Sequence, residues 1–302
     1  MKYSAGYKVK PITTTVTLYG AIYNIARQRI LFRYIMDFST QELYRNAVAW
    51  AKHAGEIQLA SFRKKNLGIE TKSNEHDIVT FVDKSCESYL LSQIAEKYPS
   101  HAVLGEETGM HEKKSPFLWV IDPLDGTTNY SQGLPLFCVS IGLQYEGRTI
   151  IGVVYAPYLD ELYTAVAGEG AYCNGKPIHV SEKCRLDRSV LCTGFPVDKD
   201  RNPDNNLDNV ARILPLVRGL RRQGSAAYDL CCTAAGFLDG FWEMGLSPWD
   251  VCAGALIVNE AGGEVRSFRN DRKVAIAAGA PALLDLFFPL LANRPPQQGG
   301  HE

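Results

Sequence analysis

An apolar run that ends in two closely spaced carboxylates constrains this chain more than any other feature. Residues 119 to 130 read Trp-Val-Ile-Asp-Pro-Leu-Asp-Gly-Thr-Thr-Asn-Tyr, so an expected strand leads straight into Asp122 and Asp125. Pro123 restricts the backbone between them, which lets both carboxylates converge on one hard cation, and Gly126 lets main-chain N–H groups approach an anion closely. Taken alone, the pattern is also compatible with a solvated turn, because Asp-Gly is a common turn dipeptide.

Length and charge exclude several classes of protein. A chain of 302 residues, 46% of them hydrophobic, forms either one large layered domain or two closely packed halves. Lys and Arg total 32 against 33 for Asp and Glu, so the formal net charge of -1 gives no general attraction to nucleic acid or anionic lipid. No apolar stretch is long enough for a membrane-spanning helix, so partners must be inferred from individual sites.

The cysteine pattern favours a reducing compartment. The chain has eight cysteines, mostly within apolar runs, with no Cys-x-x-Cys pair and no histidine at zinc-ligand spacing. Adjacent Cys231 and Cys232 are expected to be structural, because neighbouring cysteines rarely meet the geometry of a disulfide. We therefore expect buried free thiols and a cytoplasmic protein.

The two ends of the chain differ from the rest. Residues 1–35 contain basic side chains and no acidic one, a composition also seen in targeting peptides. Met36 is followed by Ser39 and Glu42, which form a capping box at the expected start of a helix, so we expect Met36 to be the natural start. Residues 294–302, rich in Pro, Gln and Gly, are expected to be a flexible tail.

Hydrophobic periodicity predicts a mixed α/β fold. Residues 40–63 and the segment from about 82 to 95 have helical spacing, and the turns at Glu146-Gly147 and Asn174-Gly175 favour antiparallel strand pairs. Strand and helix signals alternate from about residue 188, which indicates α/β layering. We expect an α+β half over 36–187 and an α/β half over 188–293. The strands expected after the second helix are 102–105, 117–121, 137–145, 149–155 and 161–166, and the alternating strand and helix segments are 189–194, 206–218, 219–222, 226–236, 238–244 and 248–261.

Further acidic residues follow apolar segments elsewhere. Glu106 and Glu107 come directly after an expected strand, where charged loop tips are also ordinary. Asp250 lies two residues after Pro248 in an expected first helical turn, a position where an acid can simply stabilise the helix. Asp77-Ile-Val-Thr-Phe-Val-Asp83 adds a third acidic element.

Together these motifs resemble the inositol monophosphatase family, the lithium-sensitive, magnesium-dependent phosphatases. The segment from Asp122 to Tyr130 is similar to the central signature of that family, and Trp249-Asp250 with Glu260-Ala-Gly-Gly263 is similar to its second signature. The resemblance extends from about residue 40 to 290. It implies a layered αβαβα sandwich of the sugar-phosphatase type, hydrolysis of a phosphomonoester, and a homodimer.

The resemblance also implies a role for each site residue. The expected ligands of two or three Mg²⁺ ions are Glu106, Asp122, the Leu124 carbonyl, Asp125 and Asp250. Thr127 is expected to orient a water molecule, with Asp77 or Glu106 accepting its proton, while Asp83 is expected to serve only the helix start. The expected substrate contacts are Asp125, Gly126, Thr127, Ala226 and Glu243, and the expected supporting residues are Lys72, Glu107 and Thr80.

The substrate is less constrained than the reaction. Glu243 favours a small polyol phosphate, with inositol 1-phosphate as the first choice. Relatives on the same scaffold hydrolyse fructose 1,6-bisphosphate, histidinol phosphate or adenosine 3',5'-bisphosphate, and some act instead in RNA or transcription complexes. The near-neutral charge offers no electrostatic footprint for RNA.

Overall fold

The computed structural model describes residues 40–291. Residues 47–291 belong to one compact unit, which is described here by itself. The basic extension 1–35, Met36 and the tail 294–302 lie outside the described residues. The first helix occupies residues 40–61, and no helix in the described part of the chain is both long and apolar enough to cross a membrane.

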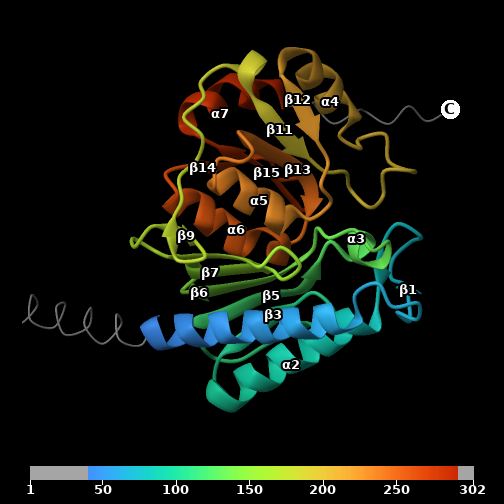
Figure 1. The fold of residues 1–302 in the computed structure, drawn as a ribbon, viewed down its shortest axis with the longest axis vertical. Coiled ribbons are helices and arrows are strands. Elements are labelled where there is room, and N and C mark those ends of the chain that lie inside the picture. The colour runs from blue at the N-terminus through green and yellow to red at the C-terminus, as the bar shows by residue number, and fades with distance from the viewer. Residues whose placement is uncertain (1–39, 292–302) are drawn as a thin grey trace, which may run out of the picture. The chain divides into compact units, whose positions relative to one another are not determined.

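An eight-stranded sheet forms the N-terminal half (Figure 1). Its strand order is β10-β9-β8-β7-β6-β5-β3-β4, and all neighbours are antiparallel except the parallel pair β3 and β5. Positive φ angles at the predicted turns, including 49° at Glu146 and 50° at Asn174, produce the tight hairpins β6–β7 and β9–β10. The strands are β3 (Ala102–Gly105), β4 (Gly109–His111), β5 (Phe117–Asp125), β6 (Cys138–Tyr145), β7 (Arg148–Ala156), β8 (Glu161–Val166), β9 (Ala171–Cys173) and β10 (Lys176–Pro177).

A five-stranded mixed sheet forms the C-terminal half, in the order β12-β11-β13-β15-β14. β11 is parallel to both β12 and β13, whereas β15 is antiparallel to β13 and β14. The strands are β11 (Val190–Thr193), β12 (Gly219–Arg221), β13 (Gly240–Leu246), β14 (Glu264–Arg269) and β15 (Val274–Gly279). A separate short hairpin, β1 (Glu70–Thr71) with β2 (Ile78–Val79), precedes the first sheet.

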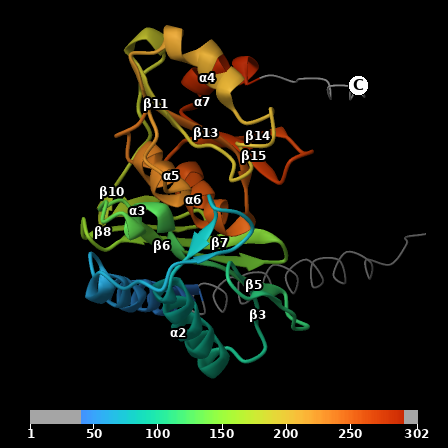
Figure 2. The same cartoon turned by 90° about the vertical axis from the view of Figure 1, so that its right-hand side faces the viewer.

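Helices separate and cover the two sheets, which gives the predicted αβαβα layering (Figure 2). Residues 47–61 and α2 lie on one face of the first sheet, α5 and α6 lie between the sheets, and α7 lies on the outer face of the second. The helices are α2 (Phe81–Lys97), α3 (Thr127–Ser131), α4 (Leu207–Ile213), α5 (Ala226–Ala234), α6 (Pro248–Glu260) and α7 (Pro281–Phe287), with 3₁₀ turns at Leu186–Arg188, Leu214–Leu216 and Phe288–Leu290.

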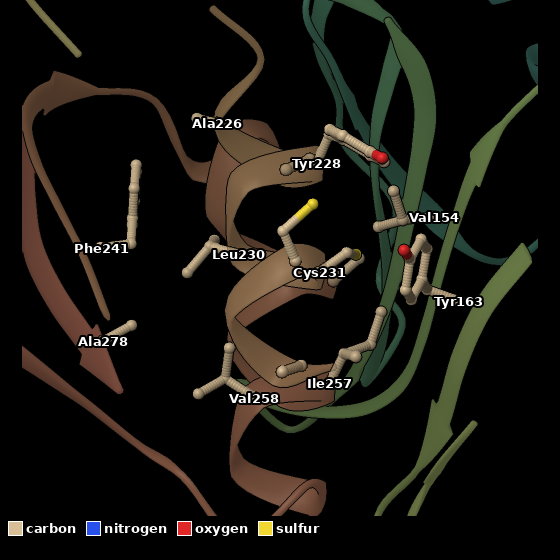
Figure 3. Packing of buried hydrophobic residues seen from close by; sticks show 14 of the residues in the cluster. Val154, Tyr163, Ala226, Tyr228, Leu230, Cys231, Phe241, Ile257, Val258 and Ala278 are labelled. Carbon is tan, nitrogen blue, oxygen red and sulfur yellow. The ribbon is translucent and has the colours of Figure 1, made fainter. Parts of the chain in front are cut away.

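The two central helices contact apolar side chains on both sides (Figure 3). In the close-up, Tyr228 and Cys231 of α5 point toward Val154 and Tyr163 of the first sheet, while Leu230 points toward Phe241 of the second. Every residue of α5 is buried. Burial of this kind contributes about 25 cal/mol for each Å² of apolar surface, so the core fixes the position of both helices.

Missing side chains on the first sheet allow α6 to approach it closely. A Cβ atom on Gly152 would lie 2.7 Å from the carbonyl oxygen of Ala253, and one on Gly142 would lie 2.4 Å from Cys252 Sγ. On the opposite side of the helix, a Cβ on Gly254 would lie 2.8 Å from Leu230 of α5. Glycines on the first sheet and in α6 therefore permit the close packing of this helix.

Two elements differ from the sequence expectation. The segment 206–218 was expected to be one helix, but α4 ends at Ile213 and a 3₁₀ turn follows, because Pro215 cannot donate the hydrogen bond that would continue the α-helix. The strand expected over 117–121 continues as β5 to Asp125, with an irregular register between Asp122 and Asp125. Asp122 and Asp125 are thus part of strand β5 rather than of a loop after it.

Candidate active site

A cavity of about 520 Å³ collects side chains from both halves of the compact unit. The sequence-predicted residues among its lining are Asp77, Glu106, Asp125, Gly126, Thr127, Ala226, Glu243 and Asp250. The other predicted site residues, which are not part of the lining, are Lys72, Thr80, Glu107, Asp122 and Leu124. Lys72, Asp122 and Leu124 contact residues of the lining, as described below.

The topology of the first sheet brings Glu106 and Asp122 together. β3 and β5 are parallel, and Gly105 pairs with Ile121, so Glu106 and Asp122 follow paired positions on two neighbouring strands. The two carboxyl groups form a hydrogen bond with each other, which requires a proton on one of them. Burial raises the pKa of Glu106 to about 7, and burial together with the charge of Glu106 raises the pKa of Asp122 well above its usual value.

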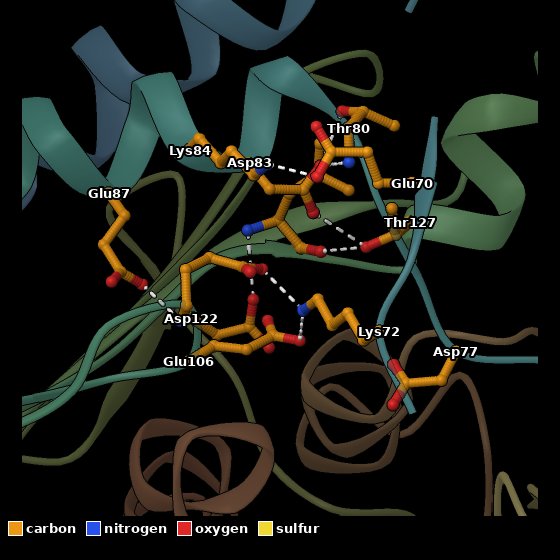
Figure 4. A network of polar contacts seen from close by, with 12 residues as sticks. Glu70, Lys72, Asp77, Thr80, Asp83, Lys84, Glu87, Glu106, Asp122 and Thr127 are labelled. Carbon is orange, nitrogen blue, oxygen red and sulfur yellow. Dashed lines mark hydrogen bonds and ion pairs between the residues drawn. The ribbon is translucent and has the colours of Figure 1, made fainter. Parts of the chain in front are cut away.

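Lys72 partly neutralises the charges of Glu106 and Glu107 (Figure 4). Its Nζ donates to Glu106 Oε1 at 2.8 Å and to Glu107 Oε1 at 2.6 Å. Burial alone would lower the pKa of Lys72, but the two carboxylates raise it above its usual value, so the side chain stays charged. The predicted supporting pair Lys72 and Glu107 therefore lies directly beside Glu106.

Asp125 connects the first sheet to the start of α5. Its Oδ2 accepts hydrogen bonds from Ser225 Oγ and from the Ala227 backbone N–H, both at 2.7 Å. Burial raises the pKa of Asp125, although these two donors oppose the shift. The carboxylate is thus positioned by the first turn of α5, which also carries Ala226.

Asp250 lies in the first turn of α6, as predicted. Its Oδ2 accepts a hydrogen bond from the Ser247 backbone N–H at 2.7 Å and completes a capping box with Ser247. Burial first, and then the charge of Asp125, raises the pKa of Asp250 well above its usual value. One carboxylate therefore both caps the helix and faces the acidic cluster.

Thr127 contacts Asp83, a residue expected to act only at the start of α2. Thr127 Oγ1 lies 2.9 Å from Asp83 Oδ1 and 3.0 Å from the Leu124 carbonyl oxygen (Figure 4). The other oxygen, Asp83 Oδ2, accepts hydrogen bonds from the Thr80 backbone N–H and hydroxyl at 2.9 and 2.6 Å. Asp83 therefore has both the expected capping contact and a second contact, with Thr127.

Asp77 lines the cavity but makes no hydrogen bond with Thr127. Its Oδ2 accepts a hydrogen bond from Ser73 Oγ at 2.6 Å within the β1–β2 turn. Thr80 is fully buried at the N-terminus of α2 and contacts Asp83 rather than the cavity. Of the two acids in the Asp77 to Asp83 motif, the second is thus the one bonded to the Thr127 hydroxyl.

Glu243 and Gly126 complete the predicted set. Glu243 projects from β13 against Gly194, where an added Cβ would overlap its carboxylate. Burial first, and then the charge of Asp229, raises the pKa of Glu243 well above its usual value. Gly126 has a φ of 93°, and a Cβ there would lie 2.9 Å from the Leu136 carbonyl oxygen, so glycine is required at the start of α3.

The donor set suits a hard cation, although the side chains are not closed around a site. Within residues 40–291, no three His, Cys, Asp or Glu side chains already converge in an arrangement that could hold a metal ion. Burial, and then the charges of Glu106, Asp125 and Asp250, nevertheless raise the pKa of Asp122. Clustered carboxylate oxygens with uncompensated charge fit Mg²⁺ better than a soft metal.

The sequence analysis missed Glu87. This residue lies on the buried face of α2, and its carboxylate accepts hydrogen bonds from the backbone N–H groups of Glu107 and Thr108 at 2.9 and 2.7 Å. It thereby holds the turn that carries Glu106. An acid at a core-facing position of the helical pattern was the available signal.

Comparison with known proteins agrees with this geometry. Residues 39–286 match the model of the inositol monophosphatase family. The chain is 45% identical over 226 residues to an inositol-1-monophosphatase of Synechocystis sp., covering 72% of this chain and 79% of that protein. It is 41% identical over 243 residues to Nus factor SuhB of Pasteurella multocida, covering 79% of this chain and 91% of the relative. Among solved structures, the inositol monophosphatase of Anabaena (Nostoc) sp. PCC 7120 superposes with a TM-score of 0.76 at 38% identity, covering 86% of this chain and 98% of that one.

The fold and the acidic cavity thus define a layered α/β phosphatase. The chain belongs to the inositol monophosphatase family, a family of phosphomonoesterases that are typically Mg²⁺-dependent. Relatives named as inositol monophosphatases and relatives named as Nus factor SuhB are similarly close to it.

Proposed function

We propose that this protein hydrolyses a small polyol phosphomonoester, with inositol 1-phosphate as the first choice, in a Mg²⁺-dependent reaction. The observation that carries the proposal is that Glu106, Asp125 and Asp250 line the same cavity as Thr127. The hydroxyl of Thr127 is in turn hydrogen-bonded to Asp83. A phosphate monoester carries two negative charges, and cations bound at the site would allow its approach and lower the pKa of a water molecule.

Five groups are suited to hold two or three Mg²⁺ ions: Glu106, Asp122, the Leu124 carbonyl, Asp125 and Asp250. Asp122 interacts electrostatically with Glu106, Asp125 and Asp250, so it is suited to contact more than one cation. Lys72 holds Glu106 and Glu107 in place from the opposite side. A bound cation would compensate the negative charge that burial disfavours on Glu106 and Asp122.

Thr127 and Asp83 are suited to remove a proton from water. The Thr127 hydroxyl donates toward Asp83 Oδ1 or the Leu124 carbonyl, which leaves its oxygen free to accept a hydrogen bond from a water molecule. Burial raises the pKa of Asp83, which makes it a better base. We assign proton transfer to this pair rather than to Asp77 or Glu106, because Asp77 is bonded to Ser73 and Glu106 to Lys72 and Asp122.

Other lining residues are suited to bind the phosphate and the alcohol of the substrate. Gly126 and Thr127 line the cavity beside the acids, where their N–H groups can contact phosphate oxygens. Ala226 and Glu243 approach from the C-terminal half, and the carboxylate of Glu243 can accept hydrogen bonds from hydroxyl groups. Asp125 borders both regions and is suited to contact both metal and substrate.

A substrate panel tests this proposal. Purified protein with Mg²⁺ is expected to release phosphate from inositol 1-phosphate faster than from histidinol phosphate or adenosine 3',5'-bisphosphate, and chelation with EDTA should stop the release. A severalfold preference for the adenosine bisphosphate would contradict the choice of a polyol ester. Absence of Mg²⁺-dependent release from every ester would contradict the phosphatase assignment itself.

The SuhB-named relatives support a second candidate function. Their printed name, Nus factor, and identities such as 41% with the Pasteurella multocida protein make a role in a transcription complex the alternative proposal. Salt-sensitive binding of RNA by a chain that starts at Met36 would support it. We also propose, from the family resemblance, a cytoplasmic homodimer that is inhibited by Li⁺, to be checked by light scattering and by assay with added LiCl.

A further inference from the structure

Gln58 is a polar side chain in the core that has no part in the proposed function. It lies in the first helix, residues 40–61, and its exposed fraction is 0%. Glutamine is mostly found at protein surfaces, because burial of a polar group costs free energy unless the group is hydrogen-bonded. The contacts that Gln58 makes must therefore account for its position.

The side-chain amide of Gln58 is only half satisfied. Its Nε2 donates a hydrogen bond to the Pro123 carbonyl oxygen at 2.8 Å, across 65 positions of the chain. Its Oε1 is buried and accepts no hydrogen bond from any of the residues 40–291. A buried acceptor without a partner is destabilising, and this cost offsets much of the gain from the Nε2 bond. Stability alone thus gives little reason for an amide at this position.

The Pro123 carbonyl lies where the pairing of the first sheet is irregular. Asp122 and Asp125 both pair with residues of β6, but the register shifts between them. Pro123 and Leu124 fall in this irregular stretch, and Pro123 has no backbone N–H to contribute to the sheet. Gln58 therefore supplies a hydrogen-bond donor at the point where the strand pairing is interrupted.

The peptide group between Pro123 and Leu124 is held from both sides. Its carbonyl oxygen accepts the bond from Gln58, and its N–H, which belongs to Leu124, donates to Asp122 Oδ1 at 3.0 Å. The carbonyl and the N–H belong to one planar trans unit and point in opposite directions, so the two bonds together fix the plane. Rotation of this unit would release the Asp122 carboxylate and would also turn the carbonyl of Leu124.

Both groups that this peptide orients belong to the expected metal ligands. The Asp122 carboxyl is hydrogen-bonded to Glu106, and the Leu124 carbonyl accepts a hydrogen bond from Thr127 Oγ1 at 3.0 Å. Gln58 does not line the cavity, so its side chain can influence a cation only through the residues that it contacts. Contacts of this kind orient ligands, and their loss typically lowers metal affinity by about 10- to 100-fold.

We infer that Gln58 is a positioning residue of the metal site, which sets the direction of the Asp122 carboxylate and of the Leu124 carbonyl by holding the peptide group between them. This inference rests on the proposed function, since it takes these two groups as Mg²⁺ ligands. The first helix, which carries none of the expected ligands, thereby takes part in cation binding.

Calorimetric titration of the full-length protein with Mg²⁺ tests this inference without turnover. Gln58→Met keeps the length of the side chain and removes the donor, so it should weaken Mg²⁺ binding by about tenfold or more. The melting temperature of the metal-free protein should change by less than about 3 °C, because one unpaired buried acceptor, the Pro123 oxygen, replaces another, Gln58 Oε1. The Mg²⁺ concentration for half-maximal phosphate release should rise by the same factor as the dissociation constant, with kcat at saturating Mg²⁺ near that of wild type.

Tyr130→Phe is the matched control. The Tyr130 hydroxyl donates to the backbone carbonyl of Gln58 at 2.6 Å, so its removal takes a buried hydrogen bond from the same residue without freeing the Pro123 carbonyl. This variant should retain the Mg²⁺ affinity of wild type. Equal weakening in Tyr130→Phe and Gln58→Met would show that packing of the first helix is responsible, and would overturn the inference.

The outcomes separate this inference from the phosphatase proposal. If wild type binds Mg²⁺ more tightly than Gln58→Met but hydrolyses no ester, the positioning role stands and the phosphatase proposal fails. If esters are hydrolysed and the two proteins bind Mg²⁺ equally, the phosphatase proposal stands and the positioning role is refuted. A Gln58→Met protein that does not fold would also refute it, because the amide would then be needed for stability. A wild-type protein that binds no Mg²⁺ would overturn both.

Discussion

The carboxyl groups of Glu106 and Asp122 are hydrogen-bonded to each other at the adjacent ends of the parallel strands β3 and β5. Two buried acids in contact with each other cannot both ionise without a compensating charge. The pair therefore links the protonation state of the cavity to its affinity for cations.

Substitution Asp122→Asn should nearly abolish turnover. Loss of the bridging ligand is expected to lower Mg²⁺-dependent phosphate release by about a thousandfold or more, because metal charge stabilisation contributes several kcal/mol. In EDTA at neutral pH, the same variant should melt at a higher temperature than wild type, since Asn lacks the carboxyl group whose raised pKa in the folded state favours unfolding. Phosphate release and thermal melting are the measurements, and unchanged turnover would refute the assignment of the metal site.

The metal-free protein should lose stability as the pH rises. The pKa of Glu106 is raised from 4.5 to about 7 in the folded state, so between these values the folded protein binds more protons than the unfolded chain. By linkage, this contribution to stability is present below about pH 4.5 and is lost as the pH rises through about 7.

Melting temperatures in EDTA and in Mg²⁺ measure this effect across the same pH range. Mg²⁺ should remove the loss, because a cation stabilises the ionised carboxylates, and its affinity should weaken below pH 7, where protons compete. A metal-free protein whose stability increases from pH 5 to pH 7.5 would contradict the prediction.

The Thr127–Asp83 contact should matter for rate rather than for metal affinity. Thr127→Val is expected to reduce kcat by about a hundredfold, the scale of positioned proton transfer, while Thr127→Ser keeps most activity because it keeps the hydroxyl. The Mg²⁺ concentration for half-maximal activity should change little in either variant. A kcat for Thr127→Val within twofold of wild type would remove this pair from the mechanism.

Asp83 needs a control for its capping role. Thr80→Ala removes the partner in the capping box of α2 and should cost about 1 kcal/mol of stability with a modest change in kcat. Asp83→Asn should instead lose kcat as Thr127→Val does. Equal kcat values in Asp83→Asn and Thr80→Ala would show that Asp83 serves only the helix.

Glu87→Gln should weaken metal binding without blocking chemistry. The carboxylate holds the turn after β3 through two backbone N–H groups, and a neutral amide can replace only one of those acceptors. An increase of about tenfold or more in the Mg²⁺ requirement is expected, with kcat at saturating Mg²⁺ near wild type. The exposed Glu96→Gln in the same helix is the control, and equal Mg²⁺ requirements in the two variants would contradict the role of Glu87.

The sequence predicted those parts of the site that depend on local patterns. Asp122, Asp125 and Asp250 each follow a recognisable strand or helix start, and the structure places them at or directly beside one cavity. The contact of Asp83 with Thr127 joins residues 44 positions apart, so no local pattern revealed it. Ala226 and Glu243 line the same cavity as the acids of the first sheet, a tertiary arrangement that periodicity does not encode.

Strand boundaries were predictable only where turn chemistry marks them. β3 and β8 have the expected bounds, and the Asn-Gly and Glu-Gly hairpins lie where their positive φ preference places them. β14 and β15 lie between the expected helix 248–261 and the tail, where the sequence analysis gave no strand bounds. Their antiparallel pairing comes from tertiary contacts, so the α/β alternation alone did not reveal the mixed character of the second sheet.

The burial of α5 and α6 between two sheets has a consequence for how such a protein can change. Asp250 belongs to α6, and the Ala227 N–H that holds Asp125 belongs to α5. A substitution that moves either carboxylate by shifting its helix must therefore also repack the core. Exposed residues of the cavity lining, such as Lys199 and Arg222, are not part of this core. New substrate preferences can therefore arise by substitution at these exposed positions, while the hydrolytic chemistry is inherited unchanged.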